Sequence, residues 1–170
     1  ENVYTKLNDL SKKTYSSVTL NISTTTDGIT LGSSYVLMDN FVSYSVEQLN
    51  LLPSDGILSG QPSTYKQERS GTARIRDGQI VQFDGDVVYI PSYEELKGGF
   101  HYHESYFKNV SDGEGRFEAE VISIAGLTGA DINVSNAKVS VDYNDTCLKR
   151  ITISYNTDLS YVNIVYQFTQ

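Results

Sequence analysis

Apolar and polar residues alternate along several stretches of the chain. Near the N-terminus the alternation runs through Val18, Leu20 and Ile22, and it returns near the C-terminus at Ile151 and Ile153. Successive side chains of a strand point to opposite faces, so this pattern predicts an antiparallel sheet with one apolar and one hydrated face. The apolar face of such a sheet needs a cover, which can be helices, a second sheet or a ligand.

Turn and capping residues divide the pattern into elements. Asp27-Gly28 and Asp77-Gly78 suit tight hairpins. Ser92 and Glu95 form a capping-box pattern, which predicts a helix of about two turns that stops at Gly98-Gly99. The other predicted elements are a helix over residues 2–13 and strands over about 16–25, 29–38, 41–48, 72–75, 79–83, 87–90, 101–108, 115–125, 137–143, 148–156 and 161–169.

Two stretches interrupt the strands. Residues 49–71 contain Pro53, Pro62 and three glycines, and we expect loops there, with a helical turn around residues 46–52. Residues 126–131 are expected to form a turn or a short helical excursion. So many strands with one apolar face will curl. The pattern leaves open whether the sheet closes into a barrel, as in lipocalins, or stays open around helices.

Composition narrows the function classes. The 170 residues carry a net charge of −8, with 39% hydrophobic and 20% charged residues. We therefore expect one soluble globular domain over residues 1–170. An acidic chain repels phosphate backbones and anionic membrane surfaces, so we predict no nucleic-acid partner. The longest apolar run is far shorter than a transmembrane segment, and the one cysteine, Cys147, allows no intramolecular disulfide.

The order of the predicted elements resembles a known superfamily. The relevant stretches are "VYTKLNDLSKKTYSSVTLNISTTTDGITLGSSYVLMDNFVSYSVEQLN", "FHYHESYFKNV" and "ITISYNTDLSYVNIVYQF". Together they are similar to the LolA/LppX-like bacterial lipoproteins. The resemblance implies an α+β fold that is mainly antiparallel β. Its curved half-barrel sheet would have about 9–11 strands, an N-terminal helix and short helices on the concave side.

The resemblance also implies a function and a location. Proteins of this superfamily can present a hydrophobic cavity for acyl chains. Their lipoprotein members begin directly after a lipidated cysteine, which fits a chain that starts at Glu1. We therefore expect an extracytoplasmic protein in the bacterial cell envelope, anchored to a membrane through a lipidated N-terminal Cys that is absent from this sequence.

Histidines and carboxylates offer weak candidates for catalysis. His101 and His103 would share one face of a predicted strand with Ser105, and two such imidazoles can share a metal. Glu118 and Glu120 would share a face of the next strand and could oppose them. Histidines and glutamates at such positions are more often simply exposed residues of a sheet. With no G-x-S-x-G elbow, P-loop or dinucleotide motif, we predict no enzyme, no metal and no cofactor.

Aromatic residues are the strongest candidates for ligand binding, because tyrosine combines an apolar ring with a polar tip. They would line the open mouth of the half-barrel, or they would simply close its core. The candidate rim residues are Tyr35, Tyr65, Phe83, Tyr89, Tyr93, Phe100, Tyr102 and Tyr106. The candidate concave face, equally the expected core, is Val18, Leu20, Ile22, Leu31, Tyr35, Ile151, Ile153 and Tyr155.

Three functions remain in order of preference. The first is a lipoprotein-type protein that binds a lipid or other hydrophobic ligand in the concavity and can have an envelope protein as partner. The second is a cell-surface adhesion or interaction module that binds a protein or glycan through an exposed Tyr/Thr/Ser sheet face. The third is a hydrolase that uses the His101 and His103 region.

Overall fold

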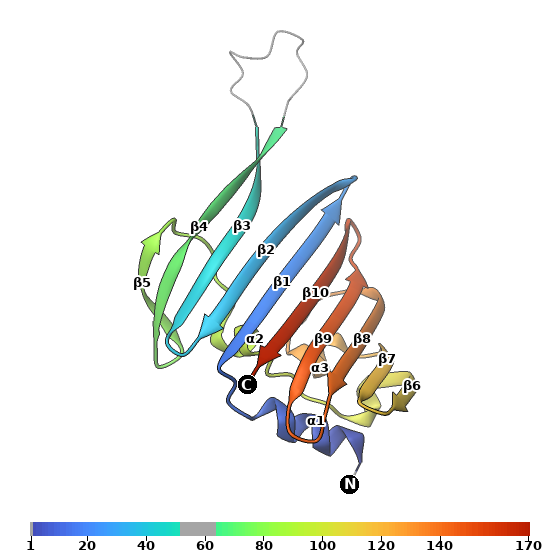
Figure 1. The fold of residues 1–170 in the computed structure, drawn as a ribbon. Coiled ribbons are helices and arrows are strands. Elements are labelled where there is room, and N and C mark those ends of the chain that lie inside the picture. Colours follow the sequence, from blue (N-terminus) through green and yellow to red (C-terminus); the bar gives the residue numbers. More distant parts are fainter. Residues whose placement is uncertain (1, 52–63) are drawn as a thin grey trace.

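A computed structural model describes residues 2–51 and 64–170, and within them one open antiparallel sheet dominates (Figure 1). The sheet has ten strands, and a few short helices accompany it. The helices are α1 (Val3–Ser11), α2 (Tyr93–Lys97), the 3-10 helix η2 (Glu104–Tyr106) and α3 (Ile124–Thr128). The strands are β1 (Ser17–Thr26), β2 (Ile29–Met38), β3 (Phe41–Leu51), β4 (Thr64–Arg76), β5 (Gln79–Gly85), β6 (Phe107–Gly113), β7 (Arg116–Val121), β8 (Ser135–Tyr143), β9 (Leu148–Asn156) and β10 (Ser160–Thr169).

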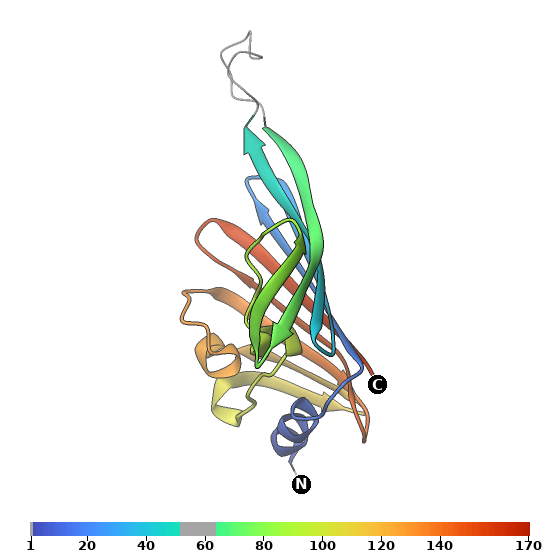
Figure 2. The same ribbon diagram turned by 90° about the vertical axis from the view of Figure 1, so that its left-hand side faces the viewer.

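The strand order is β5-β4-β3-β2-β1-β10-β9-β8-β7-β6. The first and last meanders therefore meet in the middle of the sheet, where β1 pairs with β10. The end strands β5 and β6 do not pair with each other, so the sheet stays open. The predicted curved half-barrel is confirmed, and Figure 2 shows the short helices on one side of the curved sheet.

The predicted hairpin turns are also confirmed. Asp27 and Gly28 have φ values of 52° and 78°, and Asp77 and Gly78 have values of 52° and 74°. A type I′ turn needs positive φ at both central residues, and Asp-Gly adopts this conformation readily. These turns set the register that brings the apolar side chains of neighbouring strands to the same face.

The β3–β4 hairpin is longer than predicted. Residues 46–51 are strand, so the expected helical turn there is wrong, and residues 64–71 are strand rather than loop. The reason is a polar ladder between the strands, in which Arg69 Nε donates to Gln48 Oε1 at 2.8 Å. Side chains of this kind give no hydrophobic alternation. The rest of the predicted loop, residues 52–63, lies outside the described residues.

The segment before α2 is not a strand, although one was predicted over residues 87–90. Val88 and Ile90 pack against the core, whereas Val87 and Tyr89 are 70% and 78% exposed. The alternation is therefore real, but the segment lies outside the hydrogen-bond ladder of the sheet.

Residues 101–106 also form no strand, and β6 begins only at Phe107. The Asn8 side chain of α1 replaces a neighbouring strand, because it accepts from Tyr102 N at 2.8 Å and donates to Tyr102 O at 2.7 Å. The next strand, β7, ends earlier than predicted, since Ser123 caps α3 by accepting from Gly126 N.

The core lies between the concave face of the sheet and the helices. Leu7 and Leu10 of α1, Leu96 of α2 and Leu127 of α3 are all buried against it. The fully buried large side chains are Leu7, Leu20, Val42, Leu96, Tyr102, Phe117, Leu127, Val141, Leu148, Ile151 and Ile153.

Burial of tyrosines predicts a loss of stability at alkaline pH. Burial is the main cause that raises the pKa of eight tyrosines, which are Tyr4, Tyr15, Tyr35, Tyr44, Tyr102, Tyr143, Tyr155 and Tyr166. The unfolded chain loses these protons near the ordinary pKa of about 10, before the folded chain does. The free energy of unfolding should therefore fall as the pH rises above about 10.

The measurement is the melting temperature by circular dichroism from pH 8 to 11.5, with tyrosinate absorbance followed in parallel. A melting temperature that stays constant while the buried tyrosines ionise would contradict the prediction.

Candidate functional site

A cavity of about 370 Å³ lies between the concave face of β9 and β10 and the helices α2 and α3. Figures 1 and 2 place both helices on the same side of the sheet. The lining residues are Ser92, Glu94, Glu95, Gly99, Phe100, Ile124, Thr128, Gly129, Ala130, Ile132, Ile153, Tyr155, Ile164 and Tyr166. Its apolar lining and polar edge are the usual composition of a small-molecule site.

The floor of the cavity comes from two paired strands. Ile153 and Tyr155 lie on β9, and Ile164 and Tyr166 lie on β10. The register pairs Ile164 with Ile153, which places these side chains next to each other on the concave face. The alternation of each strand thus gives the cavity four large, mostly apolar side chains.

The opposite wall comes from short helical segments. Ile124 opens α3, and Gly129 ends it with φ of 79°, a conformation that glycine adopts without strain. Phe100 meets Tyr166 edge to face, with ring centroids 5.2 Å apart. Aromatic pairs favour this geometry, so the two rings form a defined aromatic corner of the cavity.

The edge of the cavity is polar and acidic. Ser92 caps α2 by accepting from Glu95 N at 3.2 Å, and Tyr166 Oη donates to Glu95 O at 2.5 Å. Burial raises the pKa of both Tyr155 and Tyr166, and the nearby Glu95 carboxylate raises both further. Both phenols therefore stay neutral at physiological pH.

Three of the residues predicted from sequence line this cavity: Phe100 from the rim set, and Ile153 and Tyr155 from the concave face. Tyr35 and Tyr102 are buried instead. Tyr102 stacks on Phe107 and meets Phe117 edge to face, so it belongs to the core. The other predicted concave-face residues, Val18, Leu20, Ile22, Leu31 and Ile151, lie on β1, β2 and β9 outside the cavity.

The remaining rim residues lie apart from one another. Tyr65 is exposed near the start of β4, and Tyr89 is exposed before α2. Phe83 packs edge to face on Tyr44, and the Lys97 ammonium lies over the Tyr93 ring. The last one, Tyr106, packs near His101, His103 and Gly126.

The predicted ligand-binding residues do not include Ile164, Tyr166, Glu94 and Glu95; the two glutamates are predicted only as carboxylates that flank the histidine region. Ile164 and Tyr166 belong to the C-terminal alternation, and their pairing with β9 is the signal that could have found them. The two glutamates follow the recognised cap at Ser92, but their position at a cavity depends on where α2 packs.

The histidine region does not form the expected arrangement. His103 Nδ1 contacts Ser105 Oγ at 2.7 Å within a turn. Glu118 and Glu120 pair with Ser111 and Lys108 of β6, so they do not oppose the histidines. Within residues 2–51 and 64–170, no group of three His, Cys, Asp or Glu residues is placed to hold a metal ion.

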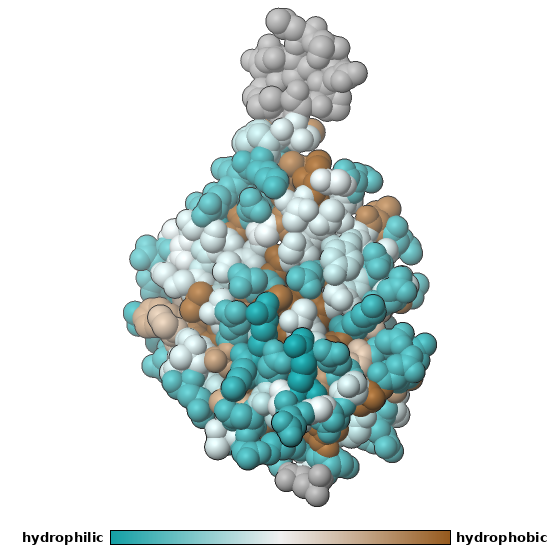
Figure 3. All heavy atoms as spheres, turned by 45° about the vertical axis from the view of Figure 1, so that its right-hand side comes forward, coloured by the Kyte–Doolittle hydropathy of each residue, from teal (hydrophilic) through white to brown (hydrophobic). Residues whose placement is uncertain are grey.

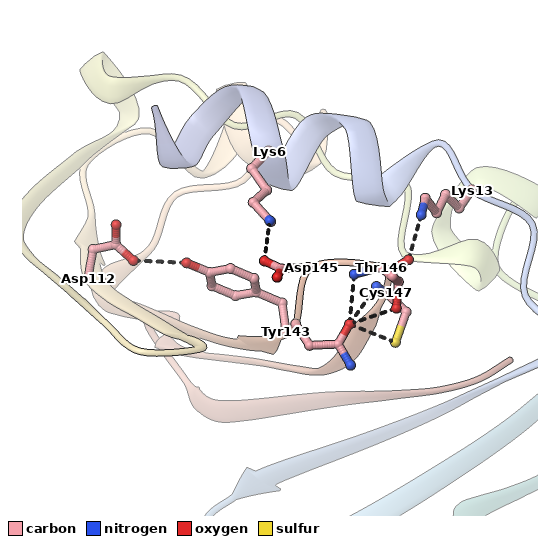
Figure 4. Close-up of polar contacts among 8 residues, drawn as sticks. Lys6, Lys13, Asp112, Tyr143, Asp145, Thr146 and Cys147 are labelled. Atoms are coloured by element: carbon pink, nitrogen blue, oxygen red, sulfur yellow. Dashed lines mark hydrogen bonds and ion pairs between the residues drawn. The ribbon is translucent and has the colours of Figure 1, made fainter. Parts of the chain in front are cut away.

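A polar cluster joins α1 to the turn between β8 and β9 (Figure 4). Lys6 Nζ donates to Asp145 Oδ1 at 2.8 Å, and Lys13 Nζ donates to Thr146 O at 2.6 Å. The Lys6 hydrogen bond lowers the pKa of the Asp145 carboxyl. Cys147 lies buried in the same turn. These contacts hold the helix against the end of the sheet, which is a structural role.

The outer face of the sheet is polar. In β1 the residues that alternate with the buried ones are Ser, Thr and Asn, including Thr19, Asn21 and Ser23. The view in Figure 3 is mostly hydrophilic or neutral, with apolar residues scattered across it. A face of this kind has little tendency to bury itself against a hydrophobic partner.

Comparisons with known proteins identify no relative: no family model matches the chain, and no curated protein matches it. None of the described helices is long and apolar enough to cross a membrane.

Proposed function

We propose that this protein is a non-enzymatic binding protein that holds a lipid or other hydrophobic ligand in the concavity of its half-barrel. The observation that carries the proposal is the cavity of about 370 Å³ with an apolar floor. Its volume lies in the range of about 300–1,000 Å³ typical of ligand sites. Its walls come from the sheet and two helices, so the fold itself creates the space.

Filling the cavity should abolish binding of an apolar probe. Ala130 lines the cavity, so Ala130→Trp would place an indole where the ligand chain lies. We expect the neutral dye N-phenyl-1-naphthylamine to bind the natural protein with enhanced fluorescence, and its affinity to fall at least about tenfold in the variant.

The matched control is Ala125→Trp, which adds the same bulk to an exposed position of α3 outside the cavity. It should leave dye affinity unchanged. Equal dye affinity in all three proteins, or no dye binding by the natural protein, would contradict the proposal.

Native mass spectrometry of the purified chain gives an independent test. A lipid-sized adduct that disappears after organic extraction is expected. If the chain is free of any adduct and does not bind the dye, the second candidate function is favoured.

That second candidate is an adhesion or interaction module that binds a protein or glycan through the outer face of the sheet. Its supporting observation is the row of small hydroxyl and amide side chains on β1. Tyr161 of the neighbouring β10 is 46% exposed and adds an aromatic contact.

The resemblance to LolA/LppX-like lipoproteins supports a location outside the cytoplasm, attached to the cell envelope through a lipid anchor. We include this location in the proposal. Its test is metabolic labelling of the full-length protein with a fatty-acid analogue in its native cells, where absence of label would contradict the anchor.

A further inference from the structure

The charged groups at the cavity all have the same sign. Glu94 and Glu95 are the only ionisable acids or bases among its described lining residues apart from the tyrosines, and no Lys, Arg or His of the described residues is part of the lining. Glu94 lies against Gly99, where an added Cβ would be only 2.8 Å from Glu94 Oε2. Because Gly99 has no Cβ, the Glu94 carboxylate can lie at the edge of the apolar cavity.

The nearest cation neutralises only part of this charge. Lys97 Nζ lies 3.4 Å from Glu94 Oε1, but this pair is well exposed and its ammonium is also directed over the Tyr93 ring. Exposed ion pairs of this kind contribute little. Glu95 has no basic partner in the described residues, and its charge raises the pKa of the half-buried phenol of Tyr155 and of the buried phenol of Tyr166.

Aromatic rings lie beside the same edge. Phe100, Tyr155 and Tyr166 all line the cavity, and Phe100 and Tyr166 form the aromatic corner. Aromatic faces attract cations, and rings combined with carboxylates are a recurring way to bind alkylated ammonium groups. An anionic head group would instead meet two carboxylates of its own sign at the exposed edge of the cavity, and like charges repel.

We propose that the ligand of this cavity is an amphiphile whose head group carries an ammonium, with its apolar chain on the floor of β9 and β10 and its head between Glu95 and the aromatic corner. This inference rests on the proposed function, because it specifies the chemistry of the ligand in the same cavity. It goes beyond that function by excluding fatty acids and purely anionic lipids as the preferred occupants.

The test is displacement of N-phenyl-1-naphthylamine from the natural protein by three decyl compounds. These are decyltrimethylammonium, decanol and decanoate, which differ in head-group charge and share one chain. We expect decyltrimethylammonium to bind about tenfold more tightly than decanoate, with decanol in between. A fourth compound, decylphosphocholine, tests which kind of ammonium ligand the cavity prefers. An affinity equal to that of decyltrimethylammonium indicates a zwitterionic lipid head group. A weaker affinity indicates an amphiphile whose head group carries only the positive charge.

Charge variants distinguish an effect of the two cavity carboxylates from an effect of the net charge of −8. The double variant Glu94→Gln, Glu95→Gln should lose most of the preference for the cation and keep its affinity for decanol. The control Glu68→Gln, Glu114→Gln changes the net charge equally at residues outside the cavity, and it should keep the tenfold preference.

The outcomes distinguish the two proposals. Equal binding of decanoate and decyltrimethylammonium, or equal loss of preference in both double variants, would overturn the proposal of an ammonium head group. Binding of decanol in the same experiment would still support a hydrophobic ligand site. Failure of all the decyl compounds and of the dye to bind would overturn the proposed function itself.

Discussion

Replacing Phe117 with alanine is expected to lower the free energy of unfolding by about 3–5 kcal/mol. Phe117 of β7 is fully buried and lies in an aromatic cluster with Tyr4, Tyr102 and Phe107. Its ring centroid is 5.3 Å from that of Phe107 and 5.8 Å from that of Tyr4. The cluster joins α1, the segment before η2, β6 and β7, so the substitution leaves a cavity that no single element can close.

Urea unfolding followed by circular dichroism measures this loss. Phe117→Leu keeps most of the volume and should cost less than about 1.5 kcal/mol. Tyr89→Ala removes an aromatic ring that is 78% exposed, and it should change the free energy by no more than about 0.5 kcal/mol. A loss for Phe117→Ala as small as that for Tyr89→Ala would show that the aromatic cluster is not part of the stabilising core.

The second large effect is expected at Gly71, where alanine should cost about 2–3 kcal/mol. Gly71 of β4 pairs with Gly85 of β5. An added Cβ at Gly71 would lie 2.5 Å from the carbonyl oxygen of Asp84 and 2.7 Å from Tyr44 Oη. Tyr44 reaches across this bare backbone to donate its hydroxyl to Asp86 O. Alanine would therefore displace both the β5 backbone and the Tyr44 side chain.

Gly113→Ala is the matched control, because a Cβ there has no atom within 4 Å and its φ is not positive. It should change the free energy of unfolding by no more than about 0.5 kcal/mol. Comparable losses for the two variants would indicate that loss of glycine as such, rather than contact with Tyr44 and β5, causes the effect. Urea unfolding of both variants under the same conditions decides this.

The strands were predictable where apolar alternation and turn chemistry agree. β1 and β2 flank Asp27-Gly28; the predicted bounds of β1 differ from the observed ones by one residue, and those of β2 are identical. Residues 101–106 are also predicted to be strand, but Asn8 of α1 and Leu127 of α3, both distant in sequence, hold their backbone in place of a neighbouring strand. A local pattern carries no information about such a partner, so the strand prediction failed there.

The candidate site was predictable to a similar extent. Alternation assigns Ile153 and Tyr155 to the concave face, and this assignment follows from the pleat alone. Which part of that face remains uncovered depends on the packing of α2 and α3. Both helices are only five residues long, and helices so short owe their positions to tertiary contacts more than to their own sequence.

The central pairing of β1 with β10 has a consequence for how the chain reaches its native state. Ser17 is opposite Thr169, so the middle of the sheet cannot assemble until the chain has emerged from the ribosome as far as Thr169. Contacts so distant in sequence require large loops to close and are associated with slow folding. Until then the β1 edge of the first meander is unpaired, and an unpaired strand edge is prone to aggregation.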